Sequence, residues 1–135
     1  MEKTLVLIKP DAVERNLIGA IIAIYEANGL KVTRMQLMQA ERHLAMEHYQ
    51  EHIGKSYFEP LMSYITRSPL VSIELQGKGA IARVRALNGN TNPAEADTNT
   101  IRGRFGLNFQ ENTVHGSDSP ASAVRELAIW FRCYC

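Results

Sequence analysis

The chain has 135 residues, of which 45% are hydrophobic and 21% charged, and its formal net charge is +1. These values are typical of one soluble globular domain over residues 1–135, and they give no overall field that would attract nucleic acid or an anionic membrane. Because the chain has no run of roughly 20 apolar residues and no signal-peptide pattern, we expect a cytoplasmic protein without a membrane partner.

The first third of the chain predicts a strand, a helix and a second strand. Thr4–Ile8 is a continuous apolar run, which is typical of a strand buried on both faces, and it ends at Lys9. Apolar residues at helical spacing predict an amphipathic helix over residues 17–27, stopped by an Asn-Gly pair. Alternating residues from Lys31 to Met38 predict a strand with one wetter face.

The next segment, Glu41–His52, is predicted to be helical and contains a histidine pattern. His48, Glu51 and His52 formally match the His-x-x-Glu-His motif of inverted zinc peptidases. The match is short and needs a third, distant ligand, and two polar residues one turn apart are also common on an exposed helix. Both interpretations stay open at this point.

A helix, a strand and a further helix follow. Tyr57–Thr66 has apolar residues in helical register, Leu70–Gln76 alternates as a strand with one buried face, and Gly79–Leu87 returns to a helix. Positions two apart do not share a helix face, so at most one of Arg83 and Arg85 is expected to enter a given pocket.

The segment Asn88–Asn112 is long, rich in Asn, Gly and Thr, and without periodicity. A loop of this length in a compact domain is usually functional. Within it, Thr91 can donate a hydroxyl hydrogen bond and Arg102 can hold phosphate oxygens through its fork of donors. The alternative is that these side chains are simply solvated.

A histidine at the end of a short strand is the strongest candidate for chemistry. A β-branched pair delivers His115 to a strand end, and Ser119 followed by Pro120 is typical of a helix start. The helix is predicted over Pro120–Phe131. Its expected core-facing stripe consists of Ala121, Val124, Leu127, Ala128 and Phe131.

This position gives His115 a possible chemical role. A helix N-terminus favours an anion, and an imidazole beside a phosphate can act as a nucleophile or as an acid and base. Glu126 lies two turns into the helix, where it can reach back with Ser117 as a relay and hold one ring nitrogen. The alternative is a histidine that only finishes its strand and forms local hydrogen bonds.

Four motifs in the chain together resemble the nucleoside diphosphate kinase family. The run His115-Gly116-Ser117-Asp118-Ser119, preceded by Asn112, is similar to the family's active-site signature. Ile8-Lys9-Pro10-Asp11-Ala12-Val13 resembles its opening segment, and Thr91-Asn92-Pro93-Ala94 and Thr100-Ile101-Arg102-Gly103 resemble its long loop. The matches follow the family's order and cover nearly the whole chain.

The resemblance implies an enzyme that moves the γ-phosphate of a nucleoside triphosphate to a nucleoside diphosphate. The reaction would be a ping-pong transfer through a phosphohistidine at His115. The implied site comprises His115, Glu126 and Ser117 as catalytic residues and Lys9, Tyr49, Tyr57, Arg85, Thr91, Arg102 and Asn112 as nucleotide-binding residues. Mg²⁺ would arrive on the nucleotide phosphates, because no carboxylate cluster in the sequence is fit to bind it alone.

The order of elements predicts a ferredoxin-like α+β fold, a four-stranded antiparallel sheet with helices on one face. A homo-oligomer is expected from the family. One rival is a catalytically silent nucleotide-binding or scaffolding member, since Arg104 stands where the family often has an acid and Phe109 is bulkier than its aliphatic residue. Another is a nucleic-acid-binding module, although the strands lack the exposed aromatic and basic residues of such surfaces. Cys133 and Cys135 are expected to be free thiols.

Overall fold

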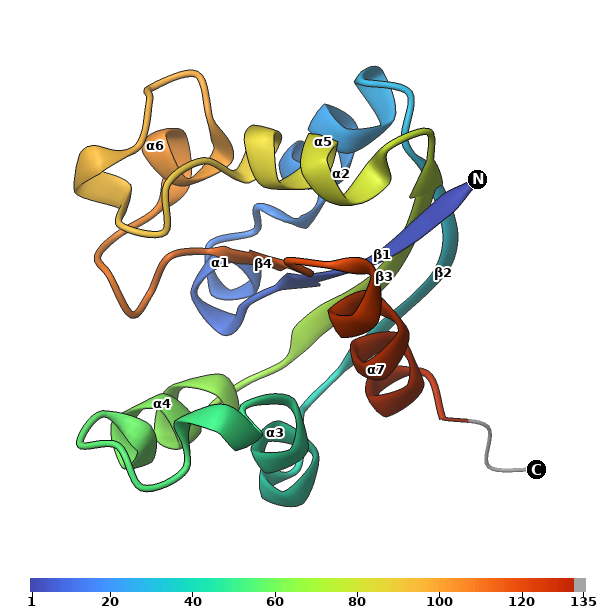
Figure 1. Ribbon diagram of the computed structural model, residues 1–135. Coiled ribbons are helices and arrows are strands. Elements are labelled where there is room, and N and C mark those ends of the chain that lie inside the picture. The colour runs from blue at the N-terminus through green and yellow to red at the C-terminus, as the bar shows by residue number, and fades with distance from the viewer. Residues whose placement is uncertain (133–135) are drawn as a thin grey trace.

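A four-stranded antiparallel sheet forms the centre of the computed structural model, which describes residues 1–132 (Figure 1). The strands are β1 (Glu2–Ile8), β2 (Lys31–Met38), β3 (Leu70–Gly77) and β4 (Val114–Gly116), in the spatial order β2-β3-β1-β4. Each neighbouring pair is antiparallel. The predicted α+β sheet is therefore confirmed, with β1 in an interior position.

Helices cover both faces of this sheet. The helices on one side are α1 (Pro10–Glu14), α2 (Ile18–Ala27), α5 (Ala80–Asn88) and α6 (Ile101–Phe105), and those on the other are α3 (Arg42–His48), α4 (Phe58–Ile65) and α7 (Pro120–Trp130). Val6 and Ile8 face the first layer, whereas Leu5 and Leu7 face the second. The expectation of helices on one face is wrong, because the unbroken apolar run of β1 has two faces to bury.

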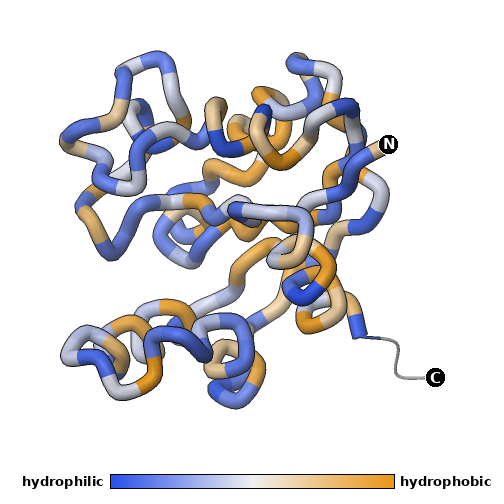
Figure 2. The backbone as a smooth tube through the Cα atoms, in the orientation of Figure 1, coloured by the Kyte–Doolittle hydropathy of each residue, from blue (hydrophilic) through white to orange (hydrophobic). Residues whose placement is uncertain are grey.

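Hydrophobic segments gather along the strands and the helices around them, whereas the segment between α5 and β4 is largely hydrophilic (Figure 2). This arrangement gives two buried clusters, one on each side of the sheet. Among residues 1–132, no helix has the length and apolar character needed to cross a membrane. Cys133 and Cys135 lie outside the described residues.

Strand β3 differs from its prediction because its polar residues are buried as well. Ser72 and Glu74 alternate with apolar residues, a pattern that suggests a wet face, yet both are almost inaccessible to solvent. Glu74 accepts a hydrogen bond from Thr33 at 2.7 Å and pairs with Arg34 at 2.7 Å. Partners on the neighbouring strand β2 therefore allow a carboxylate to lie under the second layer.

Two predicted segments are subdivided in the structure. The helix expected over Glu41–His52 ends at His48 and continues as a single 3₁₀ turn, η1 (Gln50–His52). The loop Asn88–Asn112 contains α6 and a short 3₁₀ turn, η2 (Pro93–Glu95). Helix α1 is not among the predicted elements; in the structure Pro10, which follows Lys9 directly, occupies the first position of this helix.

Helix α7 begins as predicted but buries a partly different face. The Ser119 hydroxyl accepts a hydrogen bond from the backbone N–H of Ser122 at 3.1 Å, which confirms the N-cap. Its buried residues are Ala123, Glu126, Ile129 and Trp130, whereas Val124 is 73% exposed. Leu127 and Phe131 of the predicted stripe pack against the core in part, whereas Ala121, Val124 and Ala128 are exposed, so the predicted stripe is correct only in part. Prediction from apolar residues alone does not include Glu126 in the buried face, although its polar partners allow it to be buried.

Candidate functional site

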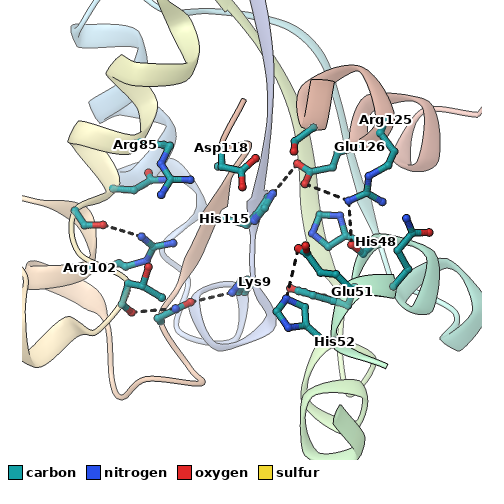
Figure 3. Close-up of a pocket in the computed structure, with 18 residues that line it drawn as sticks. Lys9, His48, Glu51, His52, Arg85, Arg102, His115, Asp118, Arg125 and Glu126 are labelled. Atoms are coloured by element: carbon teal, nitrogen blue, oxygen red, sulfur yellow. Dashed lines mark hydrogen bonds and ion pairs between the residues drawn. The ribbon is translucent and has the colours of Figure 1, made fainter. Parts of the chain in front are cut away.

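Residues from both helical layers meet around a polar cavity of about 330 Å³ beside β4 (Figure 3). The structure brings eight of the predicted site residues to its walls: Lys9, Tyr49, Arg85, Thr91, Arg102, Asn112, His115 and Glu126. Ser117 lies behind Glu126, and Tyr57 lines an adjoining cavity. Segments more than one hundred positions apart in the sequence thus converge on one site.

His115 is oriented by a carboxylate from α7. Its Nε2 lies 2.8 Å from Oε1 of Glu126, and its side chain is 21% exposed, towards the cavity. A carboxylate accepts hydrogen bonds, so in the neutral imidazole the proton is on Nε2 and the lone pair is on Nδ1. The structure therefore does not support a purely local role for this histidine, and it leaves the lone pair of Nδ1 free of this contact.

Glu126 is itself held by Ser117. The Ser117 hydroxyl donates to Glu126 Oε1 at 2.7 Å, and it accepts a hydrogen bond from the backbone N–H of Leu5 at 3.2 Å. On the other side, Arg125 Nη2 lies 3.8 Å from Glu126 Oε2. The expectation of Ser117 as a relay is therefore wrong. Glu126 contacts His115 directly, and Ser117 fixes the carboxylate from behind.

Three cationic side chains line the cavity, in which the carboxyl group of Asp118 also lies near Arg85. Within residues 1–132, none of Lys9, Arg85 and Arg102 forms an ion pair at 4 Å or less. Burial, and next the charge of Arg102, lower the pKa of Lys9 to about 7. Burial likewise lowers the pKa of Arg102. Three cationic side chains in a partly enclosed site favour a multiply charged anion.

Arg102 is fixed by main-chain carbonyl groups. Its Nη1 donates to the carbonyl of Gly89 at 2.7 Å, and its Nη2 donates to the carbonyl of Val114 at 2.7 Å. Its Nε is buried and has no partner within the described chain. Arg102 therefore ties the end of α5 to β4 while keeping its positive charge at the cavity, and this structural contribution was not anticipated.

A chain of hydrogen bonds joins β1 to the long loop. Lys9 Nζ donates to Asn112 Oδ1 at 2.9 Å, and Asn112 Nδ2 donates to the carbonyl of Thr91 at 3.1 Å. Lys9 and Asn112 are buried, whereas Thr91 is exposed at the cavity. The ammonium group is thus placed by an amide that also orients the loop.

The two arginines of α5 separate as their spacing predicts. Arg85 lies at the cavity wall, whereas Arg83 donates hydrogen bonds to the carbonyls of Lys78 and Asn28, at the other end of the helix. Arg83 is therefore held by main chain rather than simply solvated. On the facing wall, the buried Tyr49 hydroxyl has no hydrogen-bond partner within residues 1–132, and burial raises its pKa. Such a group is available to a ligand.

An apolar cavity of about 490 Å³ adjoins the polar one. The two share Lys9, Tyr49, His52, Thr91 and Asn112. Two aromatic side chains, Tyr57 and Phe109, line the apolar part and are exposed there. Tyr57 Oη lies 2.5 Å from His52 Nδ1, so the ring has a fixed support. The combined shape fits a ligand with a charged end and a flat apolar end.

The zinc-peptidase pattern is not assembled. Because α3 ends at His48, His52 turns away with η1 and contacts Glu51 and Tyr57 instead. In the described part of the chain, the only cluster with three potential metal ligands consists of His48, His115 and Glu126. Its two nitrogens and one oxygen do not suit Mg²⁺, which prefers oxygen ligands in octahedral geometry.

Sequence reasoning missed His48 and Arg125 as residues of this site. Both line the cavity, and Arg125 Nη1 donates to the carbonyl of Glu47 at 3.0 Å. No spacing rule relates α3 to α7, which are about 80 positions apart and meet only through the fold. In sequence, His48 stands out only as part of the pattern His48, Glu51 and His52, which suggests a different kind of site.

Comparison with known proteins supports the same family along the whole chain. A family model described as nucleoside diphosphate kinase matches residues 2–134. The nucleoside diphosphate kinase of Clostridium perfringens is 54% identical over 131 residues, which cover 97% of this chain and 92% of that protein. That of Desulfitobacterium hafniense is 52% identical over 132 residues, which cover 98% and 89%.

Solved structures agree with these sequence relatives. The nucleoside diphosphate kinase of Halobacterium salinarum, in complex with CDP, superposes with a TM-score of 0.95 at 40% identity, covering 98% of this chain and 88% of that one. That of Aquifex aeolicus superposes with a TM-score of 0.93 at 34% identity, covering 96% and 94%.

Proposed function

Since the chain belongs to the nucleoside diphosphate kinase family, we propose that it transfers the γ-phosphate of a nucleoside triphosphate to a nucleoside diphosphate through His115. The observation that carries the proposal is the contact between His115 Nε2 and Glu126, because it leaves Nδ1 as the free nucleophile beside the cationic side chains of the cavity. The curated relatives are named as the enzyme, which favours catalysis over a silent nucleotide-binding or scaffolding role.

The first half-reaction is an attack of His115 Nδ1 on the γ-phosphorus. A P–N bond forms, the bond from phosphorus to the β,γ-bridging oxygen breaks, and its electron pair leaves with the nucleoside diphosphate. The Nε2 proton stays between the ring and Glu126, where the carboxylate stabilises the positive charge that develops on the imidazole. In the second half-reaction, a β-phosphate oxygen of another diphosphate attacks the phosphohistidine, and the nitrogen recovers its lone pair.

The cationic residues stabilise the charge on the transferring phosphoryl group. Phosphoryl transfer has a loose transition state, so catalysis depends mostly on positioning and electrostatic stabilisation. Arg85 and Arg102 would hold phosphate oxygens, with donors from Thr91 and Tyr49. Their placement around one cavity with His115 supports these roles.

The apolar cavity would hold the base. Tyr57 and Phe109 offer ring faces for stacking, and Lys9 and Asn112, on the boundary of the two cavities, would address the sugar. Stacking alone distinguishes bases weakly, since every base has a π-face. The Halobacterium salinarum relative was solved with CDP, a nucleoside diphosphate, which supports a nucleotide as the ligand of this combined site.

Magnesium would enter as part of the substrate, bound to the nucleotide phosphates. The donor set of His48, His115 and Glu126 is unsuited to Mg²⁺, and Glu126 is already engaged with His115 and Ser117.

We place the enzyme in the cytoplasm, where nucleoside di- and triphosphates are available. We also propose a homo-oligomer, since the edge strand β2 leaves Met35 and Leu37 exposed.

Labelling with γ-³²P ATP and Mg²⁺, without an acceptor, tests the proposal. The protein should acquire acid-labile, base-stable phosphate and release it on addition of a different nucleoside diphosphate. His115→Ala should acquire none, whereas the matched control His43→Ala, at an exposed histidine of α3, should label normally. A folded wild-type protein that fails to label would refute the mechanism, and so would label in His115→Ala.

A further inference from the structure

A second buried histidine, which the mechanism above does not use, packs against the nucleophile. His48 is the last residue of α3 and is 3% exposed. Its ring meets that of His115 edge to face, with 4.6 Å between the ring centroids and 81° between the planes. Figure 3 shows the two rings side by side, with Glu126 above them. His115 is therefore held by a hydrogen bond on one edge and by ring packing from His48.

Trp130 determines which nitrogen of His48 carries the proton. The indole Nε1–H donates to His48 Nδ1 at 3.0 Å, in a fully buried contact. An indole N–H can only donate, so Nδ1 must keep its lone pair and the proton of the neutral ring is on Nε2. A metal ion would need the Nε2 lone pair, so this hydrogen bond also opposes metal binding at His48.

Helix α7 supports His48 at a second point. Arg125 donates to the main-chain carbonyls of Glu47 and His48, at 3.0 and 3.4 Å. Trp130 and Arg125 lie on the same helix as Glu126, which orients His115. One helix therefore holds both histidines, each through a different side chain.

The surroundings of His48 oppose its protonation. Burial is the largest cause that holds its pKa well below the usual histidine value, followed by His115 on β4, Lys9 after β1, Arg125 on α7 and His52 in η1. Glu126 is the one acidic side chain in the cluster with the two histidines, and its Oε1 is engaged by His115 and Ser117. A proton on His48 would thus add a buried charge beside an imidazole that must stay unprotonated to attack.

We propose that His48 is a positioning residue for phosphoryl transfer: Trp130 fixes it as a neutral Nε2–H ring, and this ring holds His115 in the attacking orientation. The inference rests on the proposed function of His115. It predicts two separable effects. Loss of the ring should reduce the rate of transfer, whereas loss of the Trp130 donor should make His48, and with it the reaction, sensitive to acid.

Imidazole ¹⁵N NMR of the nucleotide-free protein tests the first step directly. In the wild type, His48 should show the Nε2–H tautomer and should not titrate between pH 5.5 and 8. Trp130→Phe removes the donor to Nδ1 and also part of the indole that buries the ring, so the pKa of His48 should rise and the ring should titrate within that range. An Nδ1–H tautomer or a titrating His48 in the wild type would overturn the proposal, whether or not the protein has kinase activity.

Rapid-quench labelling with γ-³²P ATP tests the second step. His48→Gln should slow phosphohistidine formation about tenfold while leaving the dissociation constant for the nucleotide unchanged, because no phosphate or base contact is altered. In Trp130→Phe, the plot of the labelling rate against pH should fall more steeply at low pH, because protonation of a second group, His48, also stops the reaction. The double variant Trp130→Phe/His48→Gln should lose this additional acid dependence. Ile129→Val, a buried neighbour on α7, should retain the wild-type profile and control for looser packing.

The two proposals fail in different ways. A folded wild type that never labels refutes the kinase mechanism. A wild type that labels normally, together with His48→Gln and Trp130→Phe variants that have its rate and pH profile, refutes the role of His48 alone. If the added acid limb persists in the double variant, it comes from another group, and the assignment to His48 is wrong.

Discussion

Replacing Glu126 by glutamine isolates the charge that orients the nucleophile, because the two side chains have nearly the same shape. Oε1 of Glu126 accepts from both His115 and Ser117, at 2.8 and 2.7 Å. Because His115 and Ser117 both donate to the site of Oε1, the amide oxygen of glutamine must occupy that site. The NH₂ group of glutamine then occupies the site of Oε2. That group then faces Arg125, where the carboxylate oxygen lies 3.8 Å from Nη2.

The size of the effect follows from these contacts. A hydrogen bond to a charged group contributes about 1.5–3 kcal/mol, and one between neutral groups about 0.5–1.5 kcal/mol. The imidazole becomes cationic as the phosphoryl group is transferred, so the difference of about 1–1.5 kcal/mol appears in the transition state. Since about 1.4 kcal/mol corresponds to a factor of ten, Glu126→Gln should form phosphohistidine about tenfold more slowly.

Single-turnover quench experiments with saturating MgATP give this rate without interference from nucleotide release. Glu59→Gln is the matched control, since Glu59 is exposed, pairs with Arg42 and does not line the cavity, and it should keep the wild-type rate. An unchanged rate in Glu126→Gln would show that the charge does not assist His115. A loss of more than about a thousandfold would mean that glutamine changes the orientation of the ring, and the energy argument above would fail.

Two further predictions concern the cationic residues. With its pKa lowered to about 7, mainly by burial, Lys9 loses its charge as the pH rises through neutrality. Above pH 7, kcat/KM for the nucleotide should therefore decline, and the decline should approach a factor of about ten per pH unit. In Lys9→Arg, kcat/KM should stay constant up to about pH 8.5, because arginine keeps its charge. An identical decline in both proteins would exclude Lys9 as its source. Arg102→Ala removes hydrogen bonds to two main-chain carbonyls, so the free energy of unfolding measured in urea should fall by about 2 kcal/mol. The KM for the nucleotide should rise as well. An unchanged free energy of unfolding would contradict the structural role assigned to these bonds.

The elements of this fold could be predicted where one rule dominates. Strand β1 contains the continuous run Thr4–Ile8, and α2 and α4 have regular helical spacing, so the predicted bounds agree with the structure within one or two residues. The failures occur where a polar group is buried with partners from another element. Glu74 on β3 looks solvent-exposed in sequence, because nothing local indicates Arg34 beside it.

The site divides in the same way. The motifs around Lys9, Thr91, Arg102 and His115 identified residues that the fold brings to one cavity, although no spacing rule could place them there. His48 could not be assigned from spacing, since its partners lie on β4 and α7 and are reached only after folding. Even the correct assignment of Glu126 included a wrong detail, because sequence cannot tell a direct contact from a relay.

The helix that sequence missed, α1, explains how the nucleophile and the ammonium group keep a fixed relation. Thr113, two residues before His115, has a φ of +80°, a left-handed conformation that is strained for a β-branched residue. Its hydroxyl donates to Asp11 of α1 at 3.0 Å, and its carbonyl accepts from the backbone N–H of Lys9 at 2.8 Å. Asp11 is buried and also accepts from Arg15 and Tyr64, which keeps it in place. The end of β1 and the first turn of α1 therefore hold the chain entering β4. This junction sets the positions of Lys9 and His115 together, in addition to the hydrogen bond from Lys9 to Asn112 of the long loop.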